Sequence, residues 1–356
     1  MTETDVKAHF SIGSRLIGPG QPAYLIAEVA QAHNGSIDKA HEFIDAASEA
    51  GADAVKFQTH IAAAESTLDE PFRVPLEGGD KTRFDYWKRM EFSPPDWSAL
   101  ADHARQKGLD FLSSAFSQEA IDLLSRLEVP AWKIASGETG NQVMLESMMA
   151  TGKPFLISTG MSPWTEIDGV VATMHRYGAE FALLQCTSQY PTPLENIGLE
   201  IIGQYKHRYN SPAGLSDHSG SVYPSLAAVA RGADIIEMHL TLSRDDPGPD
   251  TSSSLTVSEM RLVADARNAL AVIDANPVDK DRLGEDLQGM RDLFTRSIAP
   301  SRPLAKGTVL EADMLGLKKP GTGIPPGELE ALVGKTLKGD VSPDRLLKRD
   351  DIDGET

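Results

Sequence analysis

The chain has 356 residues, with 34 Lys and Arg against 52 Asp and Glu, which gives a formal net charge of -18. This acidic balance argues against a general affinity for nucleic acid or anionic lipid. Hydrophobic residues make up 40 % and charged residues 24 % of the chain, as in ordinary globular proteins, and no apolar run approaches the roughly 18 residues of a membrane span. Such a protein can still bind an anionic substrate if its cations converge at one site.

The N-terminal segment and the cysteine content indicate the compartment. The segment MTETDVKAHF has neither a basic nor an apolar region, so we expect no signal peptide. The single cysteine, Cys186, cannot form an intramolecular disulfide, which favours a reducing cytoplasm. No basic partner that would activate the thiol is evident in the sequence. We therefore interpret Cys186 as a small buried residue of the protein interior and not as a nucleophile. Neither a nucleic acid nor a membrane is an expected partner.

Short β-rich runs alternate with amphipathic helical stretches over residues 24–274. Strict alternation of eight strands and eight helices in about 250 residues is typical of a closed parallel (β/α)8 or TIM barrel, and favours it over an open doubly wound sheet. The predicted strands are 24–30, 54–58, 110–116, 131–136, 154–160, 181–187, 213–218 and 234–241. The predicted helices are approximately 38–50, 96–106, 118–127, 142–150, 165–176, 195–207, 221–230 and 258–273.

Four segments do not fit this alternation. Residues 1–23 precede the first strand and are expected to form a leader or hairpin. Residues 61–92 are a long insert with the charged aromatic cluster FDYWKRMEF, and their place after a strand predicts a lid over the pocket. Residues 275–293 are polar and suit a linker with some helix. Residues 294–356 carry closely spaced turn signals, including KKPGTGIPPG, and predict a small β-rich domain.

Polar side chains recur at the C-terminal ends of all eight predicted strands, where barrel enzymes carry their active sites. Packing alone does not require this pattern, so it indicates an enzyme. In strand order the residues are Glu28 and the motif His33-Asn34-Gly35, Lys56 and Gln58, Ser113 and Ser114, Lys133 with Ser136 and Glu138, Ser158, Thr187 with Ser188 and Tyr190, Ser216 with Asp217 and His218, and Glu237 with His239.

Lys56 and Lys133 are predicted to point into the barrel, because each alternates with apolar neighbours along its strand. A buried lysine is costly unless it is paired or neutralised, so a structural ion pair is one interpretation of each. Two lysines together with strand-end serines and the turn at 158–160 favour a site for phosphate or carboxylate oxygens. A Schiff-base lysine is the rival functional interpretation.

His218 and His239 come from neighbouring strands and are predicted to ligate one divalent ion. Two imidazoles with oxygen donors nearby suit manganese or another divalent ion and leave positions open for water and substrate. A closed structural zinc site is disfavoured because the chain has a single thiol. Histidines on predicted helices, loops or the leader are expected to be exposed, and these are His9, His41, His60, His103, His175 and His207.

These motifs resemble those of the sialic acid synthase family, whose members condense phosphoenolpyruvate with a hexosamine to form a nine-carbon 3-deoxy-2-keto acid. The resemblance covers nearly the whole chain. It rests on 26-IAEVAQAHNGS-36, 51-GADAVKFQTH-60, 131-AWKIASGE-138, 158-STGM-161, 184-LQCTSQYPTP-193, 214-GLSDH-218, 237-EMH-239 and 247-PGPD-250. The segment 318-KKPGTGIPP-326 is similar to the antifreeze-like SAF (β-clip) domain that these synthases append to the barrel.

The resemblance implies a role for each matching position. His218 and His239 would bind manganese, with magnesium or cobalt as alternatives, and Glu28 would position or deprotonate a water molecule. The residues implied to be catalytic are Glu28, Lys56, Lys133, Glu138 and Glu237. Those implied to hold phosphoenolpyruvate are Lys56, Ser114, Lys133, Ser136, Ser158 and Ser216, and those implied to lie near the sugar or the same centre are Gln58, Glu138, Ser188, Tyr190, Asp250 and Lys319.

The family also implies a domain-swapped homodimer, in which the appended domain of one chain caps the barrel of the other and Lys319 acts in trans. The chain departs from the family pattern at Ala32, Gln185 and Ser188, and Lys319 replaces an Arg, which loses the bidentate fork. These departures leave the sugar open among N-acetylmannosamine, its 6-phosphate, and a 2,4-diacetamido-2,4,6-trideoxyhexose that leads to legionaminic- or pseudaminic-type acids. A Schiff-base aldolase and a non-catalytic carbohydrate- or ice-binding protein are the remaining alternatives.

Overall fold

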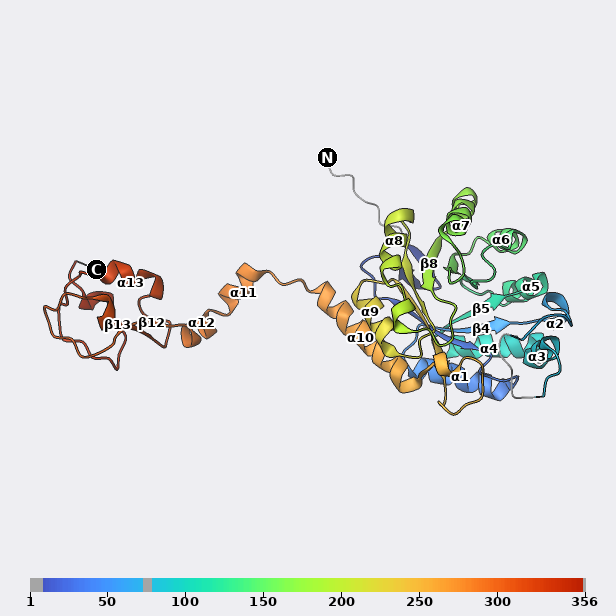
Figure 1. The fold of residues 1–356 in the computed structure, drawn as a ribbon, viewed down its shortest axis with the longest axis horizontal. Coiled ribbons are helices and arrows are strands. Elements are labelled where there is room, and N and C mark those ends of the chain that lie inside the picture. The colour runs from blue at the N-terminus through green and yellow to red at the C-terminus, as the bar shows by residue number, and fades with distance from the viewer. Residues whose placement is uncertain (1–8, 73–78, 355–356) are drawn as a thin grey trace. The chain divides into compact units, whose positions relative to one another are not determined.

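The computed structural model describes residues 9–72 and 79–354. The chain forms two compact units, Met1–Ala275 and Asn276–Thr356, and each is considered by itself. The first unit is a closed eight-stranded parallel barrel with helices around it (Figure 1), which confirms the predicted (β/α)8 fold. In the described part of the chain, no helix is both long enough and apolar enough to cross a membrane.

The barrel strands pair in chain order, and the last strand pairs with the first to close the barrel. Each strand lies within the range expected for it or extends one residue beyond. The strands are β3 (Tyr24–Ala30), β4 (Ala54–Thr59), β5 (Asp110–Ala115), β6 (Trp132–Ile134), β7 (Phe155–Ser158), β8 (Phe181–Cys186), β9 (Ala213–Asp217) and β10 (Ile235–Thr241), and the short β11 (Leu255–Thr256) pairs with β10.

Eight helices pack their apolar faces against the outside of the barrel. Hydroxyl side chains begin several of them, as where Ser93 and Asp96 form a capping box. The helices are α1 (Ile37–Glu49), α4 (Pro94–Gln106), α5 (Gln118–Arg126), α6 (Gln142–Met149), α7 (Trp164–Tyr177), α8 (Glu200–Tyr209), α9 (Val222–Ala230) and α10 (Val257–Ala275). The helix expected over 195–207 was placed too early. It begins at Glu200 because Gly198 has a φ of +71°, which an α-helix does not contain.

Inward-facing side chains change from apolar to polar along most of the barrel strands. On β3, Tyr24 and Ile26 belong to an inner apolar cluster, and Glu28 follows on the same face and lines a pocket. The N-terminal hairpin of β1 (Phe10–Ile12) and β2 (Arg15–Ile17) adds its apolar side chains to that inner cluster. Apolar packing therefore fills one end of the barrel and leaves the other end to polar residues.

The insert after β4 contains the short helices α2 (Ala62–Glu65) and α3 (Arg83–Met90), while residues 73–78 lie outside the described ranges. Tyr86, Trp87 and Met90 of α3 pack against Ala62, so the insert has a small apolar cluster of its own. Four insert residues line the pocket at the polar end of the barrel, which is the position expected of a lid segment.

The second unit has an independent apolar core formed by Ile298, Leu304, Leu310, Leu315, Ile324, Leu332, Leu337, Val341, Leu347 and Ile352. Its regular strands, β12 (Ser297–Pro300) and β13 (Leu315–Lys318), pair antiparallel, and isolated bridges supply the remaining β-structure among its described residues. The expected linker is largely helical, with α11 (Lys280–Asp286) and α12 (Gln288–Phe294), and α13 (Leu329–Leu332) is a single turn.

Candidate active site

A pocket of about 370 Å³ opens at the C-terminal ends of the barrel strands. Its volume falls within the range usual for small-molecule sites. The structure brings together in it most of the residues singled out in the sequence, namely Glu28, Lys56, Gln58, Ser114, Lys133, Ser136, Ser158, Ser188, Tyr190, Ser216, His218, Glu237, His239 and Asp250.

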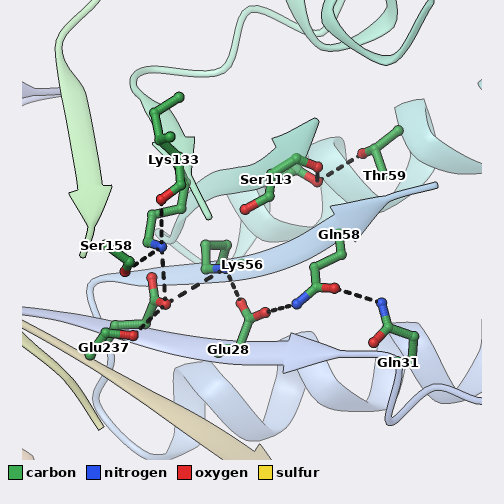
Figure 2. A network of polar contacts seen from close by, with 12 residues as sticks. Glu28, Gln31, Lys56, Gln58, Thr59, Ser113, Lys133, Ser158 and Glu237 are labelled. Atoms are coloured by element: carbon green, nitrogen blue, oxygen red, sulfur yellow. Dashed lines mark hydrogen bonds and ion pairs between the residues drawn. The ribbon is translucent and has the colours of Figure 1, made fainter. Parts of the chain in front are cut away.

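Two lysines and two glutamates that line this pocket form a buried cluster (Figure 2). The Nζ of Lys56 lies 2.7 Å from Glu28 Oε2 and 3.7 Å from Glu237 Oε1. The Nζ of Lys133 lies 3.5 Å from the same Glu237 oxygen. All four side chains are at most 4 % exposed. Glu237 therefore lies between two ammonium groups in a region from which water is largely excluded.

Hydroxyl groups complete the surroundings of the cluster. Lys133 Nζ donates to Ser158 Oγ at 2.8 Å, and Ser216 Oγ donates to Glu237 Oε1 at 3.1 Å. Strand register places these groups, since Ser216 on β9 is opposite Glu237 on β10, and Glu28 on β3 is opposite Lys56 on β4. The arrangement offers fixed donors for the oxygens of a small anion.

The cluster shifts the pKa values of its members in different directions. Burial alone would raise the pKa of Glu237, but Lys133 and Lys56 hold it below its ordinary value, so this carboxylate is ionised. Burial lowers the pKa of Lys133, and the neighbouring Lys56 adds to that effect. Burial acts on Lys56 too, yet Glu237 and Glu28 raise its pKa above the ordinary value. The two lysines are thus chemically unequal.

His218 and His239 lie side by side in the same pocket lining, with ring centroids 5.1 Å apart and 68° between the ring planes. His218 Nδ1 is 3.0 Å from the carbonyl oxygen of Thr187, so it carries the proton and leaves the lone pair on Nε2, which lies 3.2 Å from the hydroxyl of Tyr190. Burial and the neighbouring His239 lower the pKa of His218 to about 3, so its imidazole is neutral. A neutral imidazole anchored by a backbone carbonyl is the form that binds metals.

Two predicted residues lie outside the lining of the pocket. Glu138 accepts a hydrogen bond from Asn141 Nδ2 at 2.9 Å and does not line the pocket. Lys319 belongs to the second unit, where its Nζ lies 5.1 Å from the ring centroid of Phe294. The roles predicted for both residues remain predictions.

Several pocket residues were missed from the sequence. They include Gln31, Phe72, Arg83, Tyr86, Trp87, Phe116 and Met161. The aromatic cluster of the insert was noted as a lid, but nothing in its spacing indicated which side chains face the pocket. The expectation that His60 is exposed was wrong, because the folded insert buries it to 5 % exposure. Its place directly after a barrel strand was the available signal.

The fold and the pocket define a (β/α)8-barrel protein with a buried lysine–carboxylate site and a separate small C-terminal domain. The chain belongs to the NeuB family, whose model matches residues 43–276, and the SAF domain model matches residues 295–353. The resemblance noted from the motifs is therefore confirmed.

Several similar proteins are named as synthases. The N,N'-diacetyllegionaminic acid synthase of Legionella pneumophila subsp. pneumophila is 33 % identical over 93 % of this chain and 94 % of its own length. The human N-acetylneuraminate-9-phosphate synthase is 31 % identical, with 95 % of each chain covered. The crystal structure of N-acetylneuraminic acid (sialic acid) synthetase from Leptospira borgpetersenii serovar Hardjo-bovis, in complex with citrate, has a TM-score of 0.70 and 27 % identity, covering 81 % of this chain and 98 % of that one.

Proposed function

We propose that this chain condenses phosphoenolpyruvate with an N-acetylated hexosamine and water to give a nine-carbon, sialic-acid-like 3-deoxy-2-keto acid and phosphate. The observation that carries the proposal is the pair of buried lysines, Lys56 and Lys133, placed around Glu237 in a pocket lined by serines. Such a site suits a small substrate that bears both a phosphate and a carboxylate. Relatives named as synthases of legionaminic acid and of N-acetylneuraminate 9-phosphate support the same reaction class.

The site offers candidate residues for the steps that follow formation of the carbon–carbon bond. Carbon 3 of the enol phosphate attacks the aldehyde carbon of the sugar, which leaves an alkoxide on the former aldehyde oxygen and a positive charge on carbon 2. The alkoxide takes up the proton that Glu28 receives from water in the next step. Water then adds to the cationic carbon 2 and gives a proton to Glu28, which is held as an acceptor by Lys56 at 2.7 Å and Gln58 at 2.9 Å. Phosphate leaves by cleavage of its bond to carbon 2, which becomes the keto group. Lys133 and the serine hydroxyls stabilise the departing charge.

His218 and His239 would hold a divalent ion, with manganese as the first candidate and magnesium or cobalt as alternatives. The residues fit such an ion, since His218 is neutral and Oε2 of the nearby Glu237 is buried without a hydrogen-bond partner among the described residues. No group of three or more His, Cys, Asp or Glu side chains suited to a metal occurs in the described ranges, so substrate or water would complete the coordination. A bound ion would polarise the sugar aldehyde.

The sugar would lie between the cluster and the insert. Tyr190, Asp250 and Ser188 line the pocket together with Arg83 and Tyr86 of the insert, and these residues are the candidates to contact the sugar. N-acetylmannosamine, its 6-phosphate, and the 2,4-diacetamido-trideoxyhexoses of legionaminic- and pseudaminic-type synthases are all candidates for the acceptor. Glu138 and Lys319 stay predicted sugar contacts.

A homodimer in which the second unit of one chain caps the barrel of the other is part of the proposal. Leu287, which caps the start of α12, and Met290 and Phe294 within α12 are exposed at a helical spacing. These exposed apolar side chains would suit contact with the second copy of the chain that the proposed homodimer requires. The double variant L287E/M290E should convert a dimer to a monomer in light scattering, and an unchanged mass would contradict that contact.

The cytoplasmic location remains a prediction from the single cysteine.

The decisive experiment is phosphate release on mixing the metal-loaded protein with phosphoenolpyruvate and a panel of N-acetylated hexoses. We expect release with one class of sugar and none without sugar. The absence of turnover with every sugar, from a folded and metal-loaded protein, would overturn the proposal.

One observation favours a Schiff-base aldolase as second candidate, namely the lowered pKa of Lys133. Borohydride trapping with pyruvate distinguishes the two, since the synthase forms no covalent adduct.

A further inference from the structure

We propose that His60 is a positioning residue, which acts with Glu65 to order a chain of side-chain hydrogen bonds that ends on Glu28. His60 directly follows β4, and Glu65 ends α2 of the insert, so the chain links the insert to the barrel interior. This inference rests on the proposed function, because Glu28 is the base of that reaction.

The imidazole of His60 is held on both faces and at one nitrogen. Its ring stacks on Trp87, with centroids 3.9 Å apart and 15° between planes, and on Phe116, with values of 4.6 Å and 5°. Its Nδ1 lies 2.5 Å from Oε1 of Glu65, whose Oε2 accepts from the backbone N–H of Ile61 at 3.3 Å. The ring therefore has one orientation, and Glu65 requires a proton on Nδ1.

The second nitrogen of His60 must then accept a hydrogen bond. Gln31 Nε2, which can only donate, lies 2.8 Å from His60 Nε2 and 2.8 Å from Gln58 Oε1. Gln58 Oε1 is also 3.3 Å from His60 Nε2, and it would accept from His60 only if that nitrogen carried a proton. The amide of Gln31 opposes such a proton. The neighbours thus assign a neutral imidazole with its proton on Nδ1.

The position of the proton on His60 also determines how Gln58 is oriented toward Glu28. Because Gln31 donates to Gln58 Oε1, the NH₂ group of Gln58 is turned toward Glu28 and donates to Oε1 at 2.9 Å (Figure 2). If the proton of His60 moved to Nε2, the side-chain amide of Gln31 would have to flip so that its oxygen accepts that proton. The amide of Gln58 would then flip as well and present its oxygen to the Glu28 carboxylate. Glu65 therefore fixes the direction of every bond in the chain without touching the substrate.

Two variants test the chain, and one variant controls for the loss of a histidine–carboxylate pair. Glu65→Gln keeps the size of the side chain but can donate to Nδ1, and His60→Phe keeps an aromatic ring between Trp87 and Phe116 without nitrogen atoms. Asp45→Asn is the control, because Asp45 Oδ1 lies 3.3 Å from His103 Nε2 on the helical exterior. We expect kcat to fall about 10- to 100-fold in both test variants, with the KM for phosphoenolpyruvate changed less than twofold, as for residues that orient other site groups. The control should match the wild type.

A direct reading of the tautomer makes the test independent of turnover. In the wild-type protein, the imidazole ¹⁵N resonances of His60, assigned by their loss in His60→Phe, should show a neutral ring protonated at Nδ1. A proton on Nε2 or a doubly protonated ring would overturn the proposal, as would a wild-type kcat in folded Glu65→Gln. If no sugar supports turnover in the wild type, the proposed function fails, while the ¹⁵N resonances still decide whether the chain is ordered as described.

Discussion

The ammonium group of Lys56 lies 2.7 Å from the carboxylate of Glu28, and neighbouring strands present both groups to the barrel interior. Both side chains are almost fully buried, so the pair lies where water cannot solvate it. A buried ion pair costs desolvation energy that a surface pair avoids. This costly pair lies at the end of the barrel that carries the candidate active site. A substitution in the pair should therefore change both the stability of the barrel and the chemistry of the site.

Removing the lysine of this pair should destabilise the barrel strongly. We expect Lys56→Met to lower the free energy of unfolding by about 3–5 kcal/mol, since it leaves the buried carboxylate of Glu28 without its cation and Glu237 with Lys133 alone. Lys88→Met is the matched control, because Lys88 lies 2.6 Å from Glu91 but its side chain is 63 % exposed. The control should cost at most about 1 kcal/mol. Urea unfolding followed by tryptophan fluorescence measures both. Equal losses in the two variants would contradict this account of the pair.

Substitution of the hydroxyl that holds Lys133 should weaken binding of the anionic substrate. Ser158→Ala removes the acceptor at 2.8 Å, and a hydrogen bond to a charged group is worth about 1.5–3 kcal/mol, so the KM for phosphoenolpyruvate should rise at least tenfold. Ser113→Ala is the control, since the equally buried Ser113 pairs with Thr59 at 2.8 Å outside the pocket lining. Steady-state kinetics with varied phosphoenolpyruvate concentration gives the KM of both variants for comparison. A KM for Ser158→Ala within twofold of the control would refute the assignment.

Loss of either pocket histidine should remove the metal. We expect His218→Ala and His239→Ala to bind manganese at least tenfold more weakly than the wild type, because each removes one of two imidazole ligands. His175→Ala, on the outer helix α7, should bind normally. Titration calorimetry of the chelator-treated proteins gives the affinities. Wild-type manganese binding in both pocket variants would place the metal elsewhere.

Stability should depend on pH through His33. Burial lowers the pKa of His33 to about 3, and its Nδ1 accepts from the Gly35 N–H at 3.1 Å, so the folded protein holds it neutral. The unfolded chain binds a proton there below about pH 6.5, so this group's contribution is present above that pH and is lost as the pH falls. Between pH 6 and pH 4 the wild type should lose about 1.4 kcal/mol per pH unit more than His33→Gln. Urea unfolding at several pH values compares the slopes, and parallel slopes would show that His33 is not held neutral.

Much of the fold and of the site could be predicted from the sequence, because both depend on local periodicity. Alternating strands and helices predict the barrel, and side chains at one end of each strand must meet in a closed parallel barrel. Residues as far apart as Glu28 and His239 could therefore be assigned to one site, and the structure places them opposite each other between β3 and β10. The start of α8 and the exposure of His60 were wrong, because a positive φ at Gly198 and burial under the insert are not periodic properties.

The sequence by itself determined most of the strand-end residues that gather at the mouth of the barrel, but not the pocket residues of the insert. Only the tertiary structure decided how they pair there, including the sharing of Glu237 between Lys56 and Lys133 and the contact of His60 with Gln31. The physical reason is that strand order and side-chain alternation are properties of short segments of the chain. Ion pairs and hydrogen bonds depend instead on distances of a few ångströms between segments, and barrel closure and the folding of the insert set those distances.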